Sequence, residues 1–369
     1  TEGHNSTIFR AFERLKEHYA PDLLLLDTDA IGFAMVAYYL QIKVVLFSEI
    51  IQSDQQSGLP PFYSRHLPQS TVGSQVRIRW EWTKLFAKKQ AYYLYDVWLR
   101  GRPDPYHKTL ANLCGFPRKE HAHTRKEWYY RLDNFPNLIL YPQELDYPRR
   151  EVPANYYYAG AMLDTERVEK HLDRGVFPND NPIVYCALGT LTEAYTDTYL
   201  SFLCRVMQVA AQQPEINLVI AVGAEELRAQ LPVPTSNVQV YDFVPQLQML
   251  QRAQLMITHG GMNSIKECIH YGVPMLVYPL HKLSEQQGNA ARVVYHGMGL
   301  QGGLDEDSEE TISNSIKAVL KESKYRISVR KMQQVFHNYR AKEQEVVEFI
   351  ESHLAEEIHV FNFAKPTGT

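Results

Sequence analysis

Short apolar runs alternate with longer segments of mixed polarity through the second half of the chain. The predicted strands cover residues 183–188, 217–222, 238–243, 255–257 and 275–278, and the predicted helices cover about 197–212, 225–230, 247–251 and the segment after 261. Alternation of short strands with helices is typical of a parallel, doubly wound α/β sheet. In such a sheet, ligands bind at the carboxyl ends of the strands.

The first half of the chain shows a shorter version of the same pattern. It predicts a helix at about 8–19, a strand at 23–26 that ends at Asp27, a helix at about 30–39 and a strand at 43–47. A length of 369 residues predicts two domains, at roughly 100–200 residues per domain. We therefore divide the chain into a first domain at 1–163, a charged linker at 164–177, a second domain at 178–324 and a terminal segment at 325–369 with a long charged helix.

The most informative stretch follows the predicted strand at 255–257. It reads His259-Gly260-Gly261 and then continues as a helix. Glycines let backbone amides approach a ligand closely, and the first turn of a helix offers unpaired N–H groups and the positive end of its dipole. This order predicts an anion site to which His259 can also donate a hydrogen bond.

A carboxylate follows in the same predicted helix. Glu267 shares a helix face with Asn263 and Ser264, at i+4 and i+3 spacing. A carboxylate does not help to bind a phosphate, but it suits two vicinal hydroxyls such as those of a ribose, so the two features together indicate a nucleotide. The alternative is structural, because Ser264-x-x-Glu267 is also a capping box and Gly-Gly before a helix is a common loop element.

A wider set of residues decides between these interpretations. It comprises Val244-Pro245-Gln246, the run at 258–267, Gly-Val-Pro-Met at 272–275, and Glu285-Gln286 with Asn289. In this order the set resembles the donor-binding signature of nucleotide-sugar-dependent glycosyltransferases of the GT-B fold, which include the UDP-glucuronosyl transferases. The resemblance implies an α/β fold of two facing Rossmann-like, doubly wound domains, the N-terminal one incomplete. It also implies that the last helix crosses back to the first domain.

The resemblance assigns donor-binding roles by position. Phe243 and Val244 would flank the base, Gln246 and Glu267 would bind the ribose, and Glu285 with Gln286 would read the sugar hydroxyls. The diphosphate would lie against His259, Gly261, Asn263, Ser264 and the Gly189-Thr190 loop. The sugar stays open, because Glu285 replaces the usual Asp and the loop at 279–285 has the length found in the peptidoglycan N-acetylglucosaminyltransferase. Because Glu267 suits a ribose with both hydroxyls, we expect UDP as the nucleotide.

The implied reaction is inverting transfer of a sugar, glucose or a related hexose, from UDP to an acceptor hydroxyl. A base removes the acceptor proton while fixed donors stabilise the leaving diphosphate, so no metal or cofactor is expected. In the family, the counterpart of Asp27 orients a catalytic histidine in a Gly-x-Gly-His turn. This sequence has no such turn, and we do not expect Gly3-His4 to replace it. At about 30 residues per βαβ unit, roughly 80–100 residues would be missing.

Composition and charge limit the remaining functions. A net charge of −4 gives no basic surface for nucleic acid. The four cysteines are scattered, which predicts reduced thiols and a cytoplasmic protein, and no apolar run approaches the roughly 18 residues of a membrane span. The pair His121 and His123 lacks nearby carboxylates or thiolates, and Asp305-Glu306-Asp307 is expected to be a solvated loop, so neither predicts a metal site.

The region at 71–134 is rich in aromatic residues and is expected to be helical. The resemblance makes it the wall of a pocket for a small lipophilic acceptor, whereas the alternative is that several of these rings belong to the core. They include Trp80, Trp82, Phe86, Tyr92, Tyr93, Tyr95, Trp98, Trp128, Tyr129 and Tyr130. A basic helix face formed by Arg77, Arg79, Lys84, Lys88 and Lys89 suits peripheral contact with an anionic membrane or, alternatively, solvent.

Three functions remain open from the sequence. The first is a glycosyltransferase of small lipophilic acceptors, and the second is a transferase of a membrane-embedded lipid acceptor. The Val-Pro-Gln run at 244–246 and the stretch at 144–148 favour the first. The third is a non-catalytic nucleotide-binding subunit that lacks the base and assists a partner.

Overall fold

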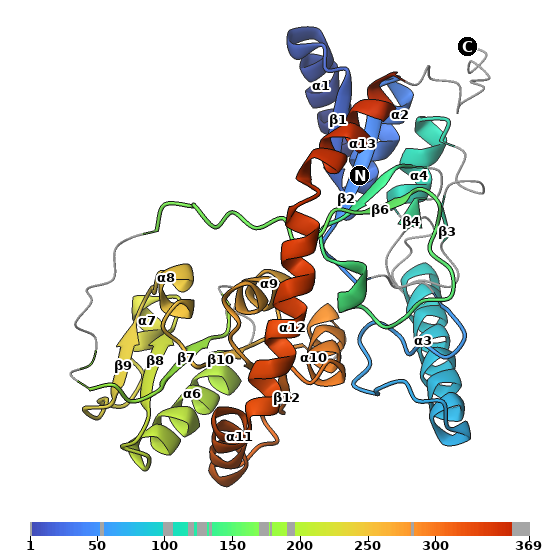
Figure 1. The fold of residues 1–369 in the computed structure, drawn as a ribbon. Helices are drawn as coiled ribbons and strands as arrows, with labels where there is room; N and C mark the ends of the chain where they lie inside the picture. The colour runs from blue at the N-terminus through green and yellow to red at the C-terminus, as the bar shows by residue number, and fades with distance from the viewer. Residues whose placement is uncertain are drawn as a thin grey trace.

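The computed structural model describes residues 2–51, 55–98, 106–116, 122–123, 131–132, 135–169, 177, 179–189, 196–281 and 284–355. Within this part the chain forms two α/β halves. A linker joins the halves, and the last two helices run between them (Figure 1).

A parallel sheet forms the core of the C-terminal half. Its strands are β7 (Ile183–Ala187), β8 (Asn217–Ala221), β9 (Val238–Tyr241), β10 (Leu255–Thr258), β11 (Met275–Val277) and β12 (Gly299–Gln301), in the order β12-β11-β10-β7-β8-β9. The predicted doubly wound sheet is therefore confirmed. The edge strand β12 was not predicted, because its three residues carry no apolar run.

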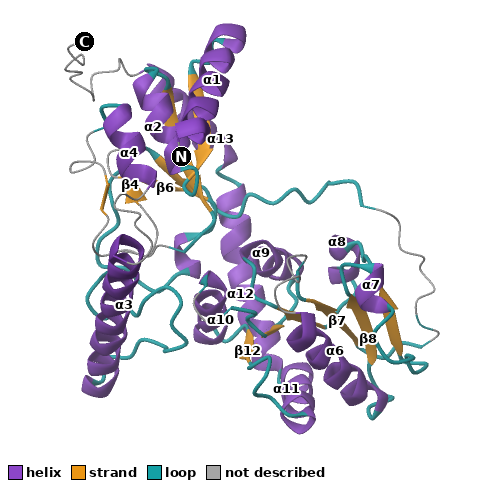
Figure 2. Cartoon of the chain, turned by 180° about the vertical axis from the view of Figure 1, so that it is seen from behind, coloured by secondary structure: helices purple, strands orange, loops and turns teal. Residues whose placement is uncertain are grey.

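Helices cover both faces of this sheet (Figure 2). They are α6 (Thr196–Ala211), α7 (Glu225–Arg228), α8 (Gln246–Leu250), α9 (Met262–Tyr271), α10 (Glu285–Tyr295) and α11 (Glu309–Lys321). Side chains of β7 alternate between two buried clusters, with Tyr185 in one and Val184 and Cys186 in the other. This alternation explains why the strands read as continuous apolar runs. The four cysteines of the chain are free.

The N-terminal half contains a smaller parallel sheet. Its strands are β1 (Leu23–Asp27), β2 (Lys43–Ser48), β5 (Asn137–Ile139) and β6 (Tyr156–Tyr158), in the order β1-β2-β5-β6, and a separate antiparallel pair joins β3 (Ala122–His123) to β4 (Arg131–Leu132). The helices are α1 (Glu2–Tyr19), α2 (Ile31–Tyr39), α3 (Val72–Trp98) and α4 (Tyr106–Leu113), with a 3-10 turn at Gln143–Leu145. Strand β1 is the edge of the described sheet, and Leu25 on it is 49% exposed.

The aromatic residues of α3 lie partly in the core and partly on the surface. Trp82 is buried, and its Nε1 donates to the carbonyl of Leu59 at 2.8 Å. Trp80 is 59% exposed and continues a row with exposed Val72 and Val76. Trp128, Tyr129 and Tyr130 lie outside the described residues, as do the side chains of Tyr92, Tyr93 and Trp98. Membrane contact through the basic face of α3 stays a prediction. Within the described part, no helix combines the length and apolar character needed to cross a bilayer.

Buried charges hold the two halves together. Lys266 on α9 is fully buried, and its Nζ lies 2.7 Å from Oε1 of Glu49, which follows β2. Asp146 in the N-terminal half contacts Arg149 at 2.7 Å and Arg292 on α10 at 2.6 Å. Burial by itself raises the pKa of Asp146, but the two guanidiniums outweigh it and leave the pKa below its ordinary value.

The terminal segment crosses back to the first half, as the resemblance implied. The single long helix predicted for this segment is in fact two helices, α12 (Ser323–Arg340) and α13 (Glu343–Ala355). Helix α12 carries Met332 and Phe336 into the core beneath α9, whereas Phe349 on α13 stacks on Tyr157 of β6 at a centroid distance of 4.9 Å. One segment therefore braces both halves (Figure 1).

Candidate functional site

The predicted anion site is built at the end of β10. His259 follows the strand, Gly260 takes a φ of +91°, and Gly261 is the N-cap of α9, which begins at Met262. No side chain in the described part of the chain caps this helix, so its first-turn amides are available to a ligand. The capping-box interpretation of Ser264 and Glu267 is wrong, because Ser264 lies inside the first turn rather than at the N-cap.

His259 lies against glycines on two sides. A Cβ at Gly189 would lie 2.8 Å from the imidazole, and a Cβ at Gly261 would also lie 2.8 Å from it. Both positions must therefore lack a side chain for the ring to fit. Burial, together with the charge of His281, lowers the pKa of His259 to about 4. The ring is thus neutral at pH 7 and has one N–H to donate.

Glu267 and Gln246 meet on one wall of an adjacent cavity of about 780 Å³. The Nε2 of Gln246 donates to Oε2 of Glu267 at 2.6 Å and lies 3.3 Å from Oγ of Ser264. Tyr185 of β7 donates from its hydroxyl to Oε1 of Gln246 at 3.4 Å. The Glu267 side chain is 4% exposed. A buried carboxylate and an amide thus face the same space.

The remaining walls of the cavity come from two strand ends and the linker. Phe243 and Val244 follow β9, and Gly189 follows β7. Phe243 is 62% exposed, which leaves its ring free to cover a flat ligand, whereas Val244 is buried. The structure therefore brings Gly189, Phe243, Val244, Gln246, Ser264 and Glu267 together around one space.

Sequence reasoning missed the residues that the linker contributes. Arg167 and Glu169 line the cavity, and Nη1 of Arg167 contacts Oε1 of Glu267 at 2.6 Å. The only sequence feature that marked this segment was its charge, and charged residues are ordinary in a linker, so they did not indicate a binding site. Nothing in the spacing of residues that are 100 positions apart could have paired Arg167 with Glu267.

Gln286 and Asn289 support the loops around the anion site. The Oε1 of Gln286 accepts from the backbone N–H of Leu280 at 2.9 Å and of His281 at 3.3 Å. Asn289 donates to the carbonyl of Gly260 at 2.9 Å. The amide oxygen of Gln286 is therefore engaged by the protein, and its role toward a sugar, like that of Glu285, stays a prediction.

Asp27 and Glu285 belong to different halves, but the charges of both affect the pKa of Asp29. The backbone N–H of Asp29 donates to Oδ1 of Asp27 at 2.7 Å. Burial raises the pKa of Asp29, and the charges of Asp27 and Glu285 raise it further. The end of β1 and the start of α10 therefore both contribute negative charge around Asp29.

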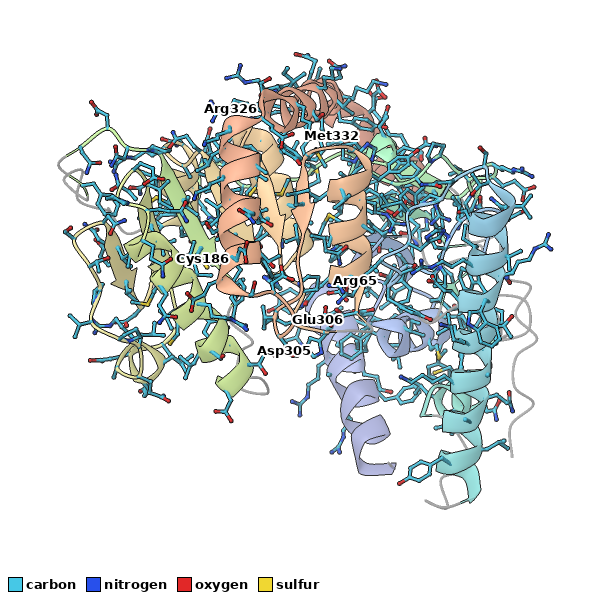
Figure 3. The ribbon with its side chains drawn as sticks, turned by 90° about the horizontal axis from the view of Figure 1, so that it is seen from below. Arg65, Cys186, Asp305, Glu306, Arg326 and Met332 are labelled. Carbon is cyan, nitrogen blue, oxygen red and sulfur yellow. The ribbon has the colours of Figure 1, made fainter. Side chains whose placement is uncertain are left out.

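Other predicted residues lie apart from the cavity. Asn263 is exposed on α9, and Thr190 lies outside the described residues. Glu306 is largely exposed and forms a 3.3 Å ion pair with Arg65 of the N-terminal half (Figure 3). In the part of the chain that the structure describes, no three His, Cys, Asp or Glu side chains gather closely enough to hold a metal ion.

Comparison with curated proteins finds glycosyltransferases. The chain is 29% identical over 208 residues to "Zeaxanthin glucosyltransferase" of Pantoea ananas, a match that covers 56% of this chain and 45% of that protein. It is 27% identical over 200 residues to "NDP-glycosyltransferase YjiC" of Bacillus subtilis (strain 168), covering 53% of this chain and 48% of that protein. The chain spans about half the length of these relatives.

Comparison with solved structures identifies the fold. CalG4, described as the calicheamicin glycosyltransferase, matches with a TM-score of 0.64 and 20% identity, covering 94% of this chain and 78% of that one. This likeness shows that the two α/β halves have the GT-B fold. A family model described as "UDP-glucoronosyl and UDP-glucosyl transferase" matches residues 14–353. The chain therefore belongs to the UDP-glucuronosyl and UDP-glucosyl transferase family.

Proposed function

We propose that this chain serves an inverting glycosyltransferase that moves a hexose from a UDP-sugar to a hydroxyl of a small lipophilic acceptor. The observation that carries the proposal is the pairing of Glu267 with Gln246 at 2.6 Å beside an uncapped helix N-terminus. The carboxylate would accept hydrogen bonds from both ribose hydroxyls. The helix amides would receive the diphosphate.

The diphosphate would leave without a metal ion. The first-turn amides of α9 and the N–H of His259 are fixed donors, and donors that are already oriented stabilise developing negative charge without reorganising. Gly189 and Gly261 keep the imidazole against this site. We therefore assign His259, Gly261, Asn263 and Ser264 to the diphosphate, with Phe243 and Val244 at the base.

On the acceptor side, Asp27 is the proposed partner of the catalytic base. A carboxylate in that role holds a histidine in one tautomer and stabilises its protonated form. The base itself is not assigned to a residue of this chain. Because Asp27 and Glu285 both act on Asp29, we place the transfer between the end of β1 and the start of α10.

A lipophilic acceptor is supported by the relatives. The zeaxanthin glucosyltransferase is named for a lipophilic hydroxylated acceptor, and its match covers more than half of this chain. The competing functions are transfer to a membrane-embedded lipid and nucleotide binding without catalysis. Turnover of a soluble aromatic or terpenoid alcohol in detergent-free buffer would favour transfer to a small lipophilic acceptor over both of these functions.

Thermal unfolding with added nucleotides tests the donor site. A ligand at about 100 times its Kd stabilises the folded state by about 2.7 kcal/mol, which raises Tm by a few degrees. We expect UDP to stabilise the protein more than TDP, because deoxyribose lacks the 2′-hydroxyl and leaves Glu267 half paired. Equal or greater stabilisation by TDP would refute the assignment of Glu267 to both ribose hydroxyls.

A further inference from the structure

We propose that Arg167, in the linker between the halves, is a positioning residue for the nucleotide. It would hold the carboxylate of Glu267 in the orientation that accepts the ribose hydroxyls and would offset the charge of that carboxylate. This inference rests on the proposed function, because it gives Arg167 a role only if Glu267 binds a ribose.

The geometry places one guanidinium between two carboxylates. The Nη1 of Arg167 contacts Oε1 of Glu267 at 2.6 Å, while its Nη2 and Nε contact Oε1 of Glu169 at 2.9 Å and 3.1 Å. The planar guanidinium presents its donors in a fixed fork. Its contact with Glu169 therefore fixes the direction from which Arg167 approaches Glu267.

Glu169 is itself anchored to the C-terminal half. Its carboxylate accepts from the backbone N–H of Leu247 at 3.1 Å and of Gln248 at 3.3 Å, at the start of α8. The Glu169 side chain is 6% exposed. In Figures 1 and 2 the described part of the linker runs from the N-terminal half to α8. Arg167 thus reaches the cavity from an attached segment.

The contacts leave room for a ribose. A carboxylate has about four lone-pair positions, two on each oxygen. Arg167 uses one on Oε1 of Glu267, and Gln246 uses one on Oε2. One position on each oxygen remains, which is the number needed for the 2′- and 3′-hydroxyls. The ribose can therefore bind while Arg167 stays in place.

Charge gives Arg167 a second effect. Glu267 is nearly buried, and a UDP diphosphate would bring further negative charge to the neighbouring end of α9. A buried carboxylate is tolerated when it is paired, and Arg167 supplies a positive charge at 2.6 Å. Burial by itself lowers the pKa of Arg167, but its bonds to Glu267 and Glu169 outweigh that effect and raise the pKa above its ordinary value. Arg167 therefore stays charged.

A double-mutant cycle tests the inference. UDP binding is measured by calorimetry for the wild type, Arg167→Ala, Glu267→Gln and the double variant. If Arg167 acts through Glu267, R167A weakens UDP binding roughly tenfold in the wild-type background and by less than about twofold when Glu267 is already Gln. Arg326→Ala, on the exposed side of α12 (Figure 3), is the matched control and leaves UDP affinity unchanged.

A second readout reports on orientation. The ratio of the Kd for 2′-deoxy-UDP to the Kd for UDP falls in R167A, because a carboxylate that is free to rotate no longer favours a ribose with both hydroxyls. R167K keeps the charge but lacks the rigid planar fork with which Arg167 approaches Glu267. Its ratio therefore also falls, while its UDP affinity lies between those of the wild type and R167A. If R167A folds poorly, R167K tests the inference in its place.

The outcomes separate the two proposals. If the wild type fails to bind UDP, the proposed function fails. If the wild type binds UDP but R167A binds it equally well or more tightly, the function stands and the inference is overturned, since Arg167 then competes with the ribose or is neutral. The inference is also overturned if R167A weakens UDP binding as much in the E267Q background as in the wild type, because Arg167 would then contact the nucleotide directly.

Discussion

At the scale of single residues, the site depends on a few buried polar groups that keep hydrogen-bonding capacity for a ligand. The Nδ1 of His259 is buried without a hydrogen-bond partner among the described residues, which is a state that proteins rarely tolerate. Glu267 is nearly buried and faces a cavity. Both groups therefore have hydrogen-bonding capacity that a bound nucleotide would use.

Replacing Glu267 with Ala should weaken UDP binding much more than folding. The change removes charge-assisted hydrogen bonds worth about 1.5–3 kcal/mol, or roughly ten- to more than a hundredfold in Kd. Because Gly261 rather than Ser264 is the N-cap of α9, no helix cap is lost. Calorimetry and a melting curve on the same variant measure both effects. A lower Tm with UDP affinity intact would show that Glu267 is a structural residue.

Stability should fall as the pH drops from about 6.5 toward 4, partly because of His259. Its pKa is lowered from 6.5 to about 4 in the folded state, so below pH 6.5 the unfolded chain binds a proton that the folded chain does not. The stabilisation from neutral His259 is fully present above pH 6.5, and its complete loss amounts to at most about 3.5 kcal/mol, at about 1.4 kcal/mol per pKa unit.

The control for this pH dependence is His259→Gln, which cannot titrate. Denaturant unfolding at pH 7 and pH 4.5 should show a smaller difference in the variant than in the wild type. The contribution of Asp146 falls in a different window, because its folded pKa lies below the ordinary 3.8 and its stabilisation is lost only on further acidification. Equal pH dependence in both proteins would mean that His259 titrates normally in the folded state.

At the scale of elements, α9 serves two purposes. One side carries Glu267 to the nucleotide cavity, and the neighbouring Lys266 crosses to Glu49 in the other half. Adjacent helix positions point about 100° apart, so one helix can serve both contacts. The helix that carries the proposed ribose ligand is therefore tied directly to the other half.

Glu49→Gln should lower Tm by a few degrees, whereas Lys266→Met should lower it less. The first change leaves a fully buried ammonium without its anion, which costs about 1–3 kcal/mol or more. The second change removes the charge and keeps most of the volume, and Glu49, which is 34% exposed, regains water. Differential scanning calorimetry of both variants measures the ranking. The reverse ranking would show that Lys266 acts mainly through its packing.

At the scale of the whole molecule, the two halves meet through charges and through the terminal helices. The Arg292–Asp146 and Lys266–Glu49 pairs cross the boundary from the C-terminal half, and α12 with α13 braces both sides. Asp27 in one half and Glu285 in the other both raise the pKa of Asp29.

Asp27→Asn should lower kcat without changing UDP affinity. In a form of the protein that transfers sugar, a disoriented base costs about 10²–10⁴-fold in rate. Calorimetry with UDP should give the same Kd for variant and wild type, because Asp27 lies in the other half.

The sequence alone determined the local order of the nucleotide site. A strand, His259-Gly260-Gly261 and a helix follow from backbone preferences that act over a few residues, and alternating apolar runs determined the parallel sheet. The terminal segment was less accurately predicted, because one charged periodic stretch does not reveal the break between α12 and α13.

Only the tertiary structure decided which distant side chains share the site. Arg167 and Glu267 are 100 positions apart, and Glu49 and Lys266 are 217 positions apart. No local preference links such residues, because their contact exists only after both halves have folded and the linker has attached to α8. The same holds for Asp27 and Glu285, whose charges act on one group only when the two sheets face each other.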